Sequence, residues 1–204
     1  MELKIIPVGP FAVNCALVFL RDSGTLLVVD PGAEAEKIVA AARTFPFVSA
    51  RILLTHAHVD HISGAGAVAR ALNVPTVELH PGDHPIYRSP ANSLEPYYSA
   101  PSDLPPVAPI APVPHCTVLE LPGHSPGGSG FLFSDGDEKF LLAGDTIFCG
   151  SIGRTDLPGG DYETLMRSIH EKILTLPPDL TIWPGHGGET TVAFEQRNNP
   201  YLAE

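Results

Sequence analysis

The chain has 204 residues, of which 44% are hydrophobic and 17% are charged, a composition typical of a folded globular protein. Its 12 basic and 23 acidic residues give a net charge of −11, and lysine and arginine form no cluster, so we expect no nucleic-acid partner. No run approaches ~18 uninterrupted apolar residues, and the N-terminus has no basic leader, so we expect neither a membrane span nor a secretion signal.

The three cysteines are odd in number, far apart in the sequence and form no C-x-x-C pair. This pattern favours a reducing compartment over a disulfide framework. We therefore expect a cytoplasmic protein, with residues 1–204 forming one domain. The sequence does not predict its oligomeric state.

The first part of the chain alternates between strand and helix patterns. Short apolar runs between turn residues predict strands at 3–9, 12–19, 25–30, 51–55 and 76–79. Helices are predicted between them, over Ala33–Arg43 and over residues 62–73.

A proline-rich segment follows, with seven prolines among the 19 residues from Pro96 to Pro114. Proline lacks a backbone donor and has a restricted φ, so this segment cannot form a central strand or a helix. We expect an irregular loop. Two interpretations stay open, namely a cover over an active site and a plain surface crossover.

Strand patterns return at 117–121, 129–133, 139–143 and 180–183. An amphipathic helix is predicted from Asp161, which can cap it, with one apolar face made of Tyr162, Leu165, Met166, Ile169 and Ile173. Residues 195–204 are predicted to be a polar tail. Strands interspersed with helices, without repeats or a linker, indicate an α/β or α+β sandwich.

Four of these strands end in side chains that can bind metals. Strand 51–55 leads into the run Thr55–His61, THAHVDH, and the other three strands lead through a glycine into one further candidate each. In sheets covered by helices, loops beyond the carboxyl ends of strands converge on ligand sites. The seven candidates are His56, His58, Asp60, His61, His124, Asp145 and His186.

Five histidines and two aspartates exceed the four donors that one tetrahedral ion needs. They suit two divalent ions that share a bridging ligand. Nitrogen and carboxylate donors favour zinc, iron or manganese over calcium or magnesium. The other four histidines stand alone in loops or on a helix, and we interpret them as structural: His80, His84, His115 and His170.

The motifs THAHVDH, PGHSPGG, AGDTIFCGSIGRTDLPGGD and WPGHG together resemble the metallo-β-lactamase superfamily, and within it the glyoxalase II-like hydrolases. The resemblance covers nearly the whole chain. It implies an αββα sandwich, two mixed β-sheets flanked by helices, with a metal site at one edge of the sheets.

The resemblance also implies a role for each candidate. His56, His58 and His124 would hold the first metal, Asp60, His61 and His186 would hold the second, and Asp145 would bridge both. It further implies a metal-bridging hydroxide that attacks an acyl carbon, with Asp60 and Asp145 as catalytic residues. No Gly-x-Ser-x-Gly is present, so a covalent serine mechanism has no support.

The resemblance implies a small-molecule thioester substrate such as an S-(hydroxyacyl)glutathione. A thiolate is a good leaving group, so its release demands no extra general acid. The longer glyoxalase II enzymes carry a C-terminal helical region that helps to hold glutathione, and here only residues 187–204 follow His186.

Arg154 has two open interpretations. It could bind a substrate carboxylate, or it could pair with a buried structural aspartate, either Asp156 or a ligand carboxylate.

One alternative function comes from the same resemblance. Persulfide dioxygenases share the H-x-H-x-D-H run and a similar G-x-G-R-T-D segment, but hold a single iron, here through His56, His124 and Asp145. A β-lactamase is less favoured, since the lactamases commonly place cysteine where Asp145 stands. A metal-binding protein without catalysis is a third class.

Overall fold

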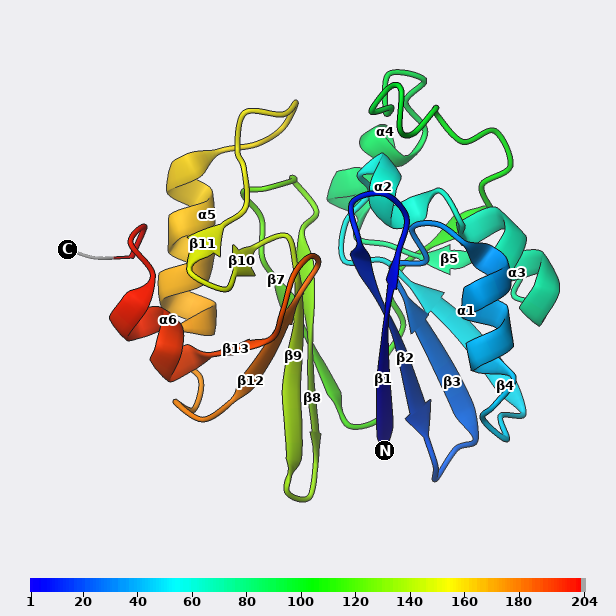
Figure 1. The fold of residues 1–204 in the computed structure, drawn as a ribbon, viewed down its shortest axis with the longest axis horizontal. Helices are drawn as coiled ribbons and strands as arrows, with labels where there is room; N and C mark the ends of the chain where they lie inside the picture. Colours follow the sequence, from blue (N-terminus) through cyan, green and yellow to red (C-terminus); the bar gives the residue numbers. More distant parts are fainter. Residues whose placement is uncertain (203–204) are drawn as a thin grey trace. The chain divides into compact units, whose positions relative to one another are not determined.

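The computed structural model describes residues 1–202 and contains two compact units, Met1–Ala111 and Pro112–Glu204 (Figure 1). The organisation of residues 1–204 as one domain stays a prediction. Among the described helices, none has the length and apolar character needed to cross a bilayer.

The first unit is built on a six-stranded mixed sheet in which the strands lie in sequence order. The pairs β1–β2 and β2–β3 are antiparallel, and the pairs from β3 to β6 are parallel. The strands are β1 (Glu2–Val8), β2 (Val13–Leu20), β3 (Thr25–Val29), β4 (Ser49–Leu53), β5 (Val77–Glu78) and β6 (Val107–Ala108).

The centre of this sheet is continuously apolar. Every residue of β2 is buried, and β3 carries a run of buried leucines and valines, as expected for strands with both faces covered. β-branched residues such as Val28 and Ile52 suit this pleated, enclosed surface. The resulting core extends to the helices of the unit, which contribute Ile38 and Val68.

The helices of the first unit are short, and α1 and α3 lie beside one another along the sheet (Figure 1). They are α1 (Ala35–Ala42), α2 (Val59–Ile62), α3 (Ala65–Leu72), the 3-10 turn η1 (Pro81–Asp83) and α4 (His84–Tyr87). The helix predicted over 62–73 is divided, because Ser63 caps α2 and Gly64 donates to the carbonyl of Pro31 before α3 begins.

The proline-rich segment contributes the edge strand β6, which pairs only with β5 in this sheet. An edge position tolerates proline, because one side of the strand needs no ladder hydrogen bonds. The segment also carries Tyr98, which is buried and packs against Phe11 of the β1–β2 loop at a ring-centroid distance of 5.6 Å. Its role as a cover over an active site stays a hypothesis.

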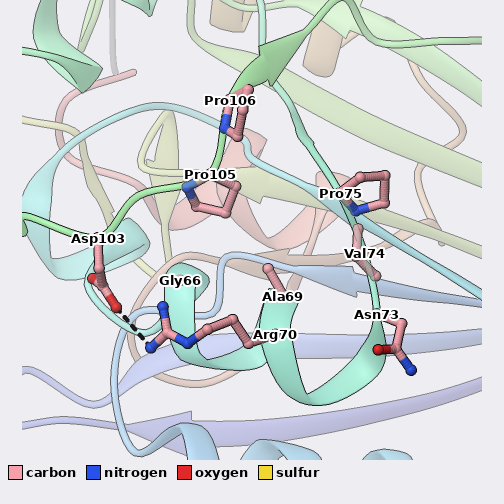
Figure 2. A pocket seen from close by; sticks show the side chains of 9 residues that line it. All are labelled: Gly66, Ala69, Arg70, Asn73, Val74, Pro75, Asp103, Pro105 and Pro106. Carbon is pink, nitrogen blue, oxygen red and sulfur yellow. Dashed lines mark ion pairs between the residues drawn. The ribbon is translucent and has the colours of Figure 1, made fainter.

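A cavity of about 440 Å³ lies in the first unit between α3 and the middle of the proline-rich segment, at Asp103, Pro105 and Pro106. Figure 2 shows its walls, where the guanidinium of Arg70 faces the carboxylate of Asp103 at 2.8 Å. The proline rings of Pro75, Pro105 and Pro106 line another part of the cavity. None of the seven predicted metal ligands contributes to this cavity.

The second unit contains a five-stranded mixed sheet of order β13-β12-β9-β8-β7, in which only the β12–β9 pair is parallel. A small hairpin, β10–β11, stands apart from it. The strands are β7 (Cys116–Glu120), β8 (Ser129–Asp135), β9 (Glu138–Gly144), β10 (Ile147–Phe148), β11 (Ser151–Ile152), β12 (Thr181–Pro184) and β13 (Thr190–Thr191).

Helix α5 (Tyr162–Ser168) continues into a π-helical turn, η2 (Ile169–Ile173). Asp161 caps it as predicted, because its carboxylate accepts a hydrogen bond from the N–H of Thr164 at 2.8 Å. Leu165, Ile169 and Ile173 are fully buried in the core of the unit. Tyr162 was expected on the same face but is 52% exposed, because it is the first residue of the helix and lies outside the packed turns.

Residues 195–202 are not a polar tail, contrary to the prediction. They belong to or follow α6 (Val192–Asn198), whose first turn is capped by Thr191. Glu195 and Asn199 are buried, which the polar sequence concealed. Residues 203–204 lie outside the described part of the chain. Two mixed sheets with helices nevertheless agree with the predicted fold class.

Candidate metal centre

The run THAHVDH lies in the first unit, at the carboxyl end of β4 and in the first residues of α2. His56 and Asp60 are nearly buried, and His61 is fully buried. The ring centroids of His56 and His58 are 4.8 Å apart, and those of His56 and His61 are 4.1 Å apart. Asp60 Oδ2 lies 3.9 Å from His61 Nε2. The four predicted ligands of this run are therefore gathered in one cluster.

Asp30 organises this cluster, although the sequence analysis did not select it. Its carboxylate accepts hydrogen bonds from the N–H of Thr55 at 2.7 Å, from the hydroxyl of Thr55 at 2.6 Å and from Nδ1 of His61 at 3.0 Å. A carboxylate that accepts from Nδ1 requires the proton to be on that nitrogen. His61 therefore presents the lone pair of Nε2, the form that binds metals.

The same carboxylate acts on His56 through Thr55. The hydroxyl proton of Thr55 is directed to Asp30, so its oxygen accepts from Nδ1 of His56, 3.0 Å away. His56 then also presents the lone pair of Nε2. One buried acid thus sets the tautomers of two predicted ligands. A signal for Asp30 was present, because it directly follows the strand Thr25–Val29 and precedes a Pro-Gly turn.

The second unit holds the other three predicted ligands. Asp145 and His186 follow β9 and β12, which are parallel and end at the same edge, with Gly185 N–H donating to the carbonyl of Gly144 at 2.8 Å. Gly144 has a φ of 54°, a left-handed conformation that suits glycine and turns the chain sharply before Asp145. His124 lies in the loop between β7 and β8.

In the second unit, the Asp145 carboxylate lies between two imidazoles. Its Oδ2 is 3.4 Å from Nε2 of His186 and 3.7 Å from Nε2 of His124. Nδ1 of His124 donates to the carbonyl of Arg154 at 2.8 Å, so Nε2 carries the lone pair on the side of Asp145. Two imidazoles that both face one carboxylate are the donor arrangement expected around a carboxylate that bridges metal ions.

Arg154 pairs with Asp156 through two bonds of 2.7 Å, which agrees with one of its two predicted interpretations. Both side chains are exposed, so Asp156 is not the buried partner that was expected. The hydrogen bonds from Arg154 lower the pKa of Asp156 to about 2. The main chain of Arg154 also contributes, since its carbonyl orients His124.

Comparison with known proteins identifies the family. The sequence profile of the metallo-β-lactamase superfamily matches residues 8–186. The chain belongs to this superfamily. It is 34% identical to hydroxyacylglutathione hydrolase GloC of Haemophilus influenzae over 216 aligned positions, covering 99% of this chain and 98% of that protein.

Two solved structures support the same assignment. The B3 metallo-β-lactamase BLEG-1 superposes with a TM-score of 0.87 at 33% identity and full coverage of both chains. TTHA1623, in a di-iron-bound form, superposes with a TM-score of 0.85 at 37% identity and covers 98% of this chain and all of that one. The fold class predicted from the sequence, the metallo-β-lactamase fold with two mixed sheets, is thereby confirmed.

The donors present fit the metal ions of this superfamily. Within each unit, imidazole nitrogens and carboxylate oxygens converge, and outer hydrogen bonds hold three of the imidazoles in the tautomer that binds metals. Nitrogen and carboxylate donors suit zinc, iron or manganese. The protein is therefore a metallo-hydrolase of the metallo-β-lactamase superfamily with a histidine and aspartate metal-binding cluster.

Proposed function

We propose that this metallo-hydrolase cleaves thioesters of the S-(hydroxyacyl)glutathione type. The observation that carries the proposal is the Asp145 carboxylate, which faces Nε2 of both His124 and His186. The relationship to GloC, at 34% identity over nearly the full length of both proteins, supports the substrate class. The partner is then a small-molecule thioester, and a net charge of −11 opposes the binding of nucleic acid.

We propose that His56, His58 and His124 hold one divalent ion and that Asp60, His61 and His186 hold a second, with Asp145 shared between them. When bound, two such ions lower the pKa of a coordinated water and polarise a carbonyl group. The di-iron form of TTHA1623, which is 37% identical, supports a site for two ions.

The residues of the chain supply orientation. Asp30 holds His61 directly and His56 through Thr55, and the carbonyl of Arg154 holds His124. Asp60 and Asp145 are the proposed catalytic residues: the Asp60 carboxylate would orient the attacking water, and the Asp145 carboxylate would be shared between the two ions. The guanidinium of Arg154, which is largely exposed and paired with Asp156, is proposed to bind a carboxylate of the substrate.

The first test measures metal content and turnover together. Protein purified without an affinity tag that binds metals should contain close to two ions per chain, zinc, iron or a mixture. It should release free thiol from an S-(hydroxyacyl)glutathione. Asp145→Ala should lose both metal ions, whereas His186→Ala should retain one. Equal metal loss in the two variants would contradict the shared role of Asp145. A single iron together with oxygen consumption on a persulfide would replace the proposal with a dioxygenase.

β-Lactam hydrolysis is a second candidate, favoured by the 33% identity to BLEG-1 over both full chains. The same metal-loaded protein should therefore be assayed with a chromogenic cephalosporin. Faster turnover of the β-lactam than of the thioester would overturn the thioester assignment and leave the metallo-hydrolase assignment intact.

A further inference from the structure

The residue between His56 and His58 is held from two sides by side chains remote in the sequence. The N–H of Ala57 donates to Oδ2 of Asp83 at 2.9 Å, and the carbonyl of Ala57 accepts from Nδ2 of Asn92 at 2.8 Å. Ala57 and Asp83 are both fully buried. These two hydrogen bonds define what we call the Ala57 clamp.

The clamp acts on two different peptide groups. The N–H of Ala57 belongs to the planar unit that joins it to His56, and its carbonyl belongs to the unit that joins it to His58. Fixing the orientation of both planes fixes the two dihedral angles of Ala57. The Cα atoms from which the side chains of His56 and His58 extend are therefore fixed relative to each other.

Both clamp residues come from the segment between β5 and β6, in the region of η1 and α4 (Figure 1). Asp83 ends η1, where its own N–H donates to the carbonyl of His80 at 3.0 Å. Asn92 lies in a turn in which its N–H donates to the carbonyl of Ser89 at 3.1 Å. Each clamp residue is thus itself anchored by a backbone hydrogen bond within this segment.

A buried carboxylate needs strong partners, because burial without them is unfavourable by several kcal/mol. An apolar residue at position 83 would fill the same core without this requirement. Packing alone therefore does not explain an aspartate at position 83. Its hydrogen bond to Ala57, the residue between the predicted ligands His56 and His58, does explain it.

We propose that Asp83 and Asn92 are positioning residues that preorganise His56 and His58 for metal binding. This inference rests on the proposed metal site but not on the thioester substrate. The clamp orders the His-Ala-His segment before the ion binds. Without the clamp, the ion would have to order this segment on binding, so loss of the clamp should weaken metal affinity.

The test measures the zinc dissociation constant of the metal-free full chain by competition with a chromophoric chelator. Asn92→Ala and Asp83→Ala should each weaken zinc binding by about 10-fold to 100-fold, the effect typical of losing an outer partner of a ligand. Asp83→Asn should weaken it less, because its amide oxygen can still accept from the N–H of Ala57. The melting temperature of each metal-free protein is recorded in parallel.

Ser89→Ala is the matched control, because Ser89 lies in the same segment as Asp83 and Asn92. Among the bonds described, its hydroxyl accepts only from the N–H of Ala91, at 3.2 Å and at the surface. It should bind zinc as the parent protein does. If Asn92→Ala also binds zinc like the parent, the proposal is overturned, whether or not its melting temperature falls. If Asp83→Ala does not fold, the zinc dissociation constant of Asn92→Ala is sufficient to test the proposal. Tight zinc binding without thioester hydrolysis would count against the proposed substrate only.

Discussion

A single carboxylate, that of Asp30, determines which ring nitrogen carries the proton in two predicted ligands. It acts directly on His61 and through the Thr55 hydroxyl on His56. Asp30 itself stands at a φ of 51°, a left-handed conformation that aspartate tolerates better than most residues. The residues that orient the candidate ligands therefore need defined positions and conformations, as the ligands themselves do.

Sequence reasoning selected the seven donors because histidine and aspartate at strand ends are chemically conspicuous. It missed Asp30, Asp83 and Asn92, because aspartate and asparagine are also ordinary turn residues. Their roles depend on contacts across about 25 to 35 residues of sequence, which no local pattern encodes. Whether all seven donors share one site stays a prediction.

The Arg154–Asp156 pair gives a prediction about pH. The pKa of Asp156 is lowered to about 2 from an ordinary 3.8, so the pair favours the folded state above about pH 4. This contribution is lost as the pH falls from about 4 to about 2. In Arg154→Ala, the Asp156 pKa should rise towards its ordinary value, as followed by NMR titration of the side-chain carboxyl carbon. An unchanged titration midpoint would show that Arg154 does not cause the shift.

At the level of elements, α6 stabilises the loop that follows Asp145. Glu195 is fully buried, and its carboxylate accepts from the N–H of Gly150, the hydroxyl of Thr190 and the side-chain amide of Asn199. Asn199 in turn donates to the carbonyl of Ser151 at 2.9 Å. The helix therefore holds the β10–β11 hairpin by hydrogen bonds, in addition to the apolar core that Ile147 of β10 shares with Val192 of α6.

This explains why the sequence predicted a polar tail at residues 195–204. Helical periodicity is recognised by apolar residues on one face, and the inward face of α6 carries an acid and is followed by a buried amide. Helix α5 has an ordinary apolar face, and its start at Asp161 was predicted correctly.

Removing the Glu195 carboxylate should destabilise the protein. Glu195→Ala leaves buried donors from three residues without their acceptor, so we expect the free energy of unfolding to fall by about 2–4 kcal/mol. Urea denaturation of the metal-free protein measures this change. Glu189→Ala, at an exposed position in the same region, should change it by less than about 0.5 kcal/mol. Similar values for the two variants would mean that the buried network contributes little.

At the scale of the whole molecule, the sequence predicted two mixed sheets with helices, and the fold of relatives with TM-scores of 0.85 and 0.87 agrees. The layered sandwich was predictable because interspersed strands and helices leave few arrangements that bury every apolar face, whereas the two mixed sheets were implied by the resemblance of the motifs to the superfamily. The predicted donors are divided between the two compact units, four in Met1–Ala111 and three in Pro112–Glu204. Ions that took ligands from both units would therefore couple the stability of each to the other.

Metal binding should then raise the stability of the whole chain. An ion that binds only the folded state at about 100 times its dissociation constant adds about 2.7 kcal/mol, which corresponds to a melting temperature about 5–10 °C higher for a chain of this size. We expect a strong chelator to lower the melting temperature by that amount in a single transition, as measured by scanning calorimetry. Asp145→Ala, which should hold neither ion, is the control and should not respond to the chelator. If the chelator lowered only one of two separate transitions, the ions would belong to one unit, and the assignment of ligands from both would be wrong.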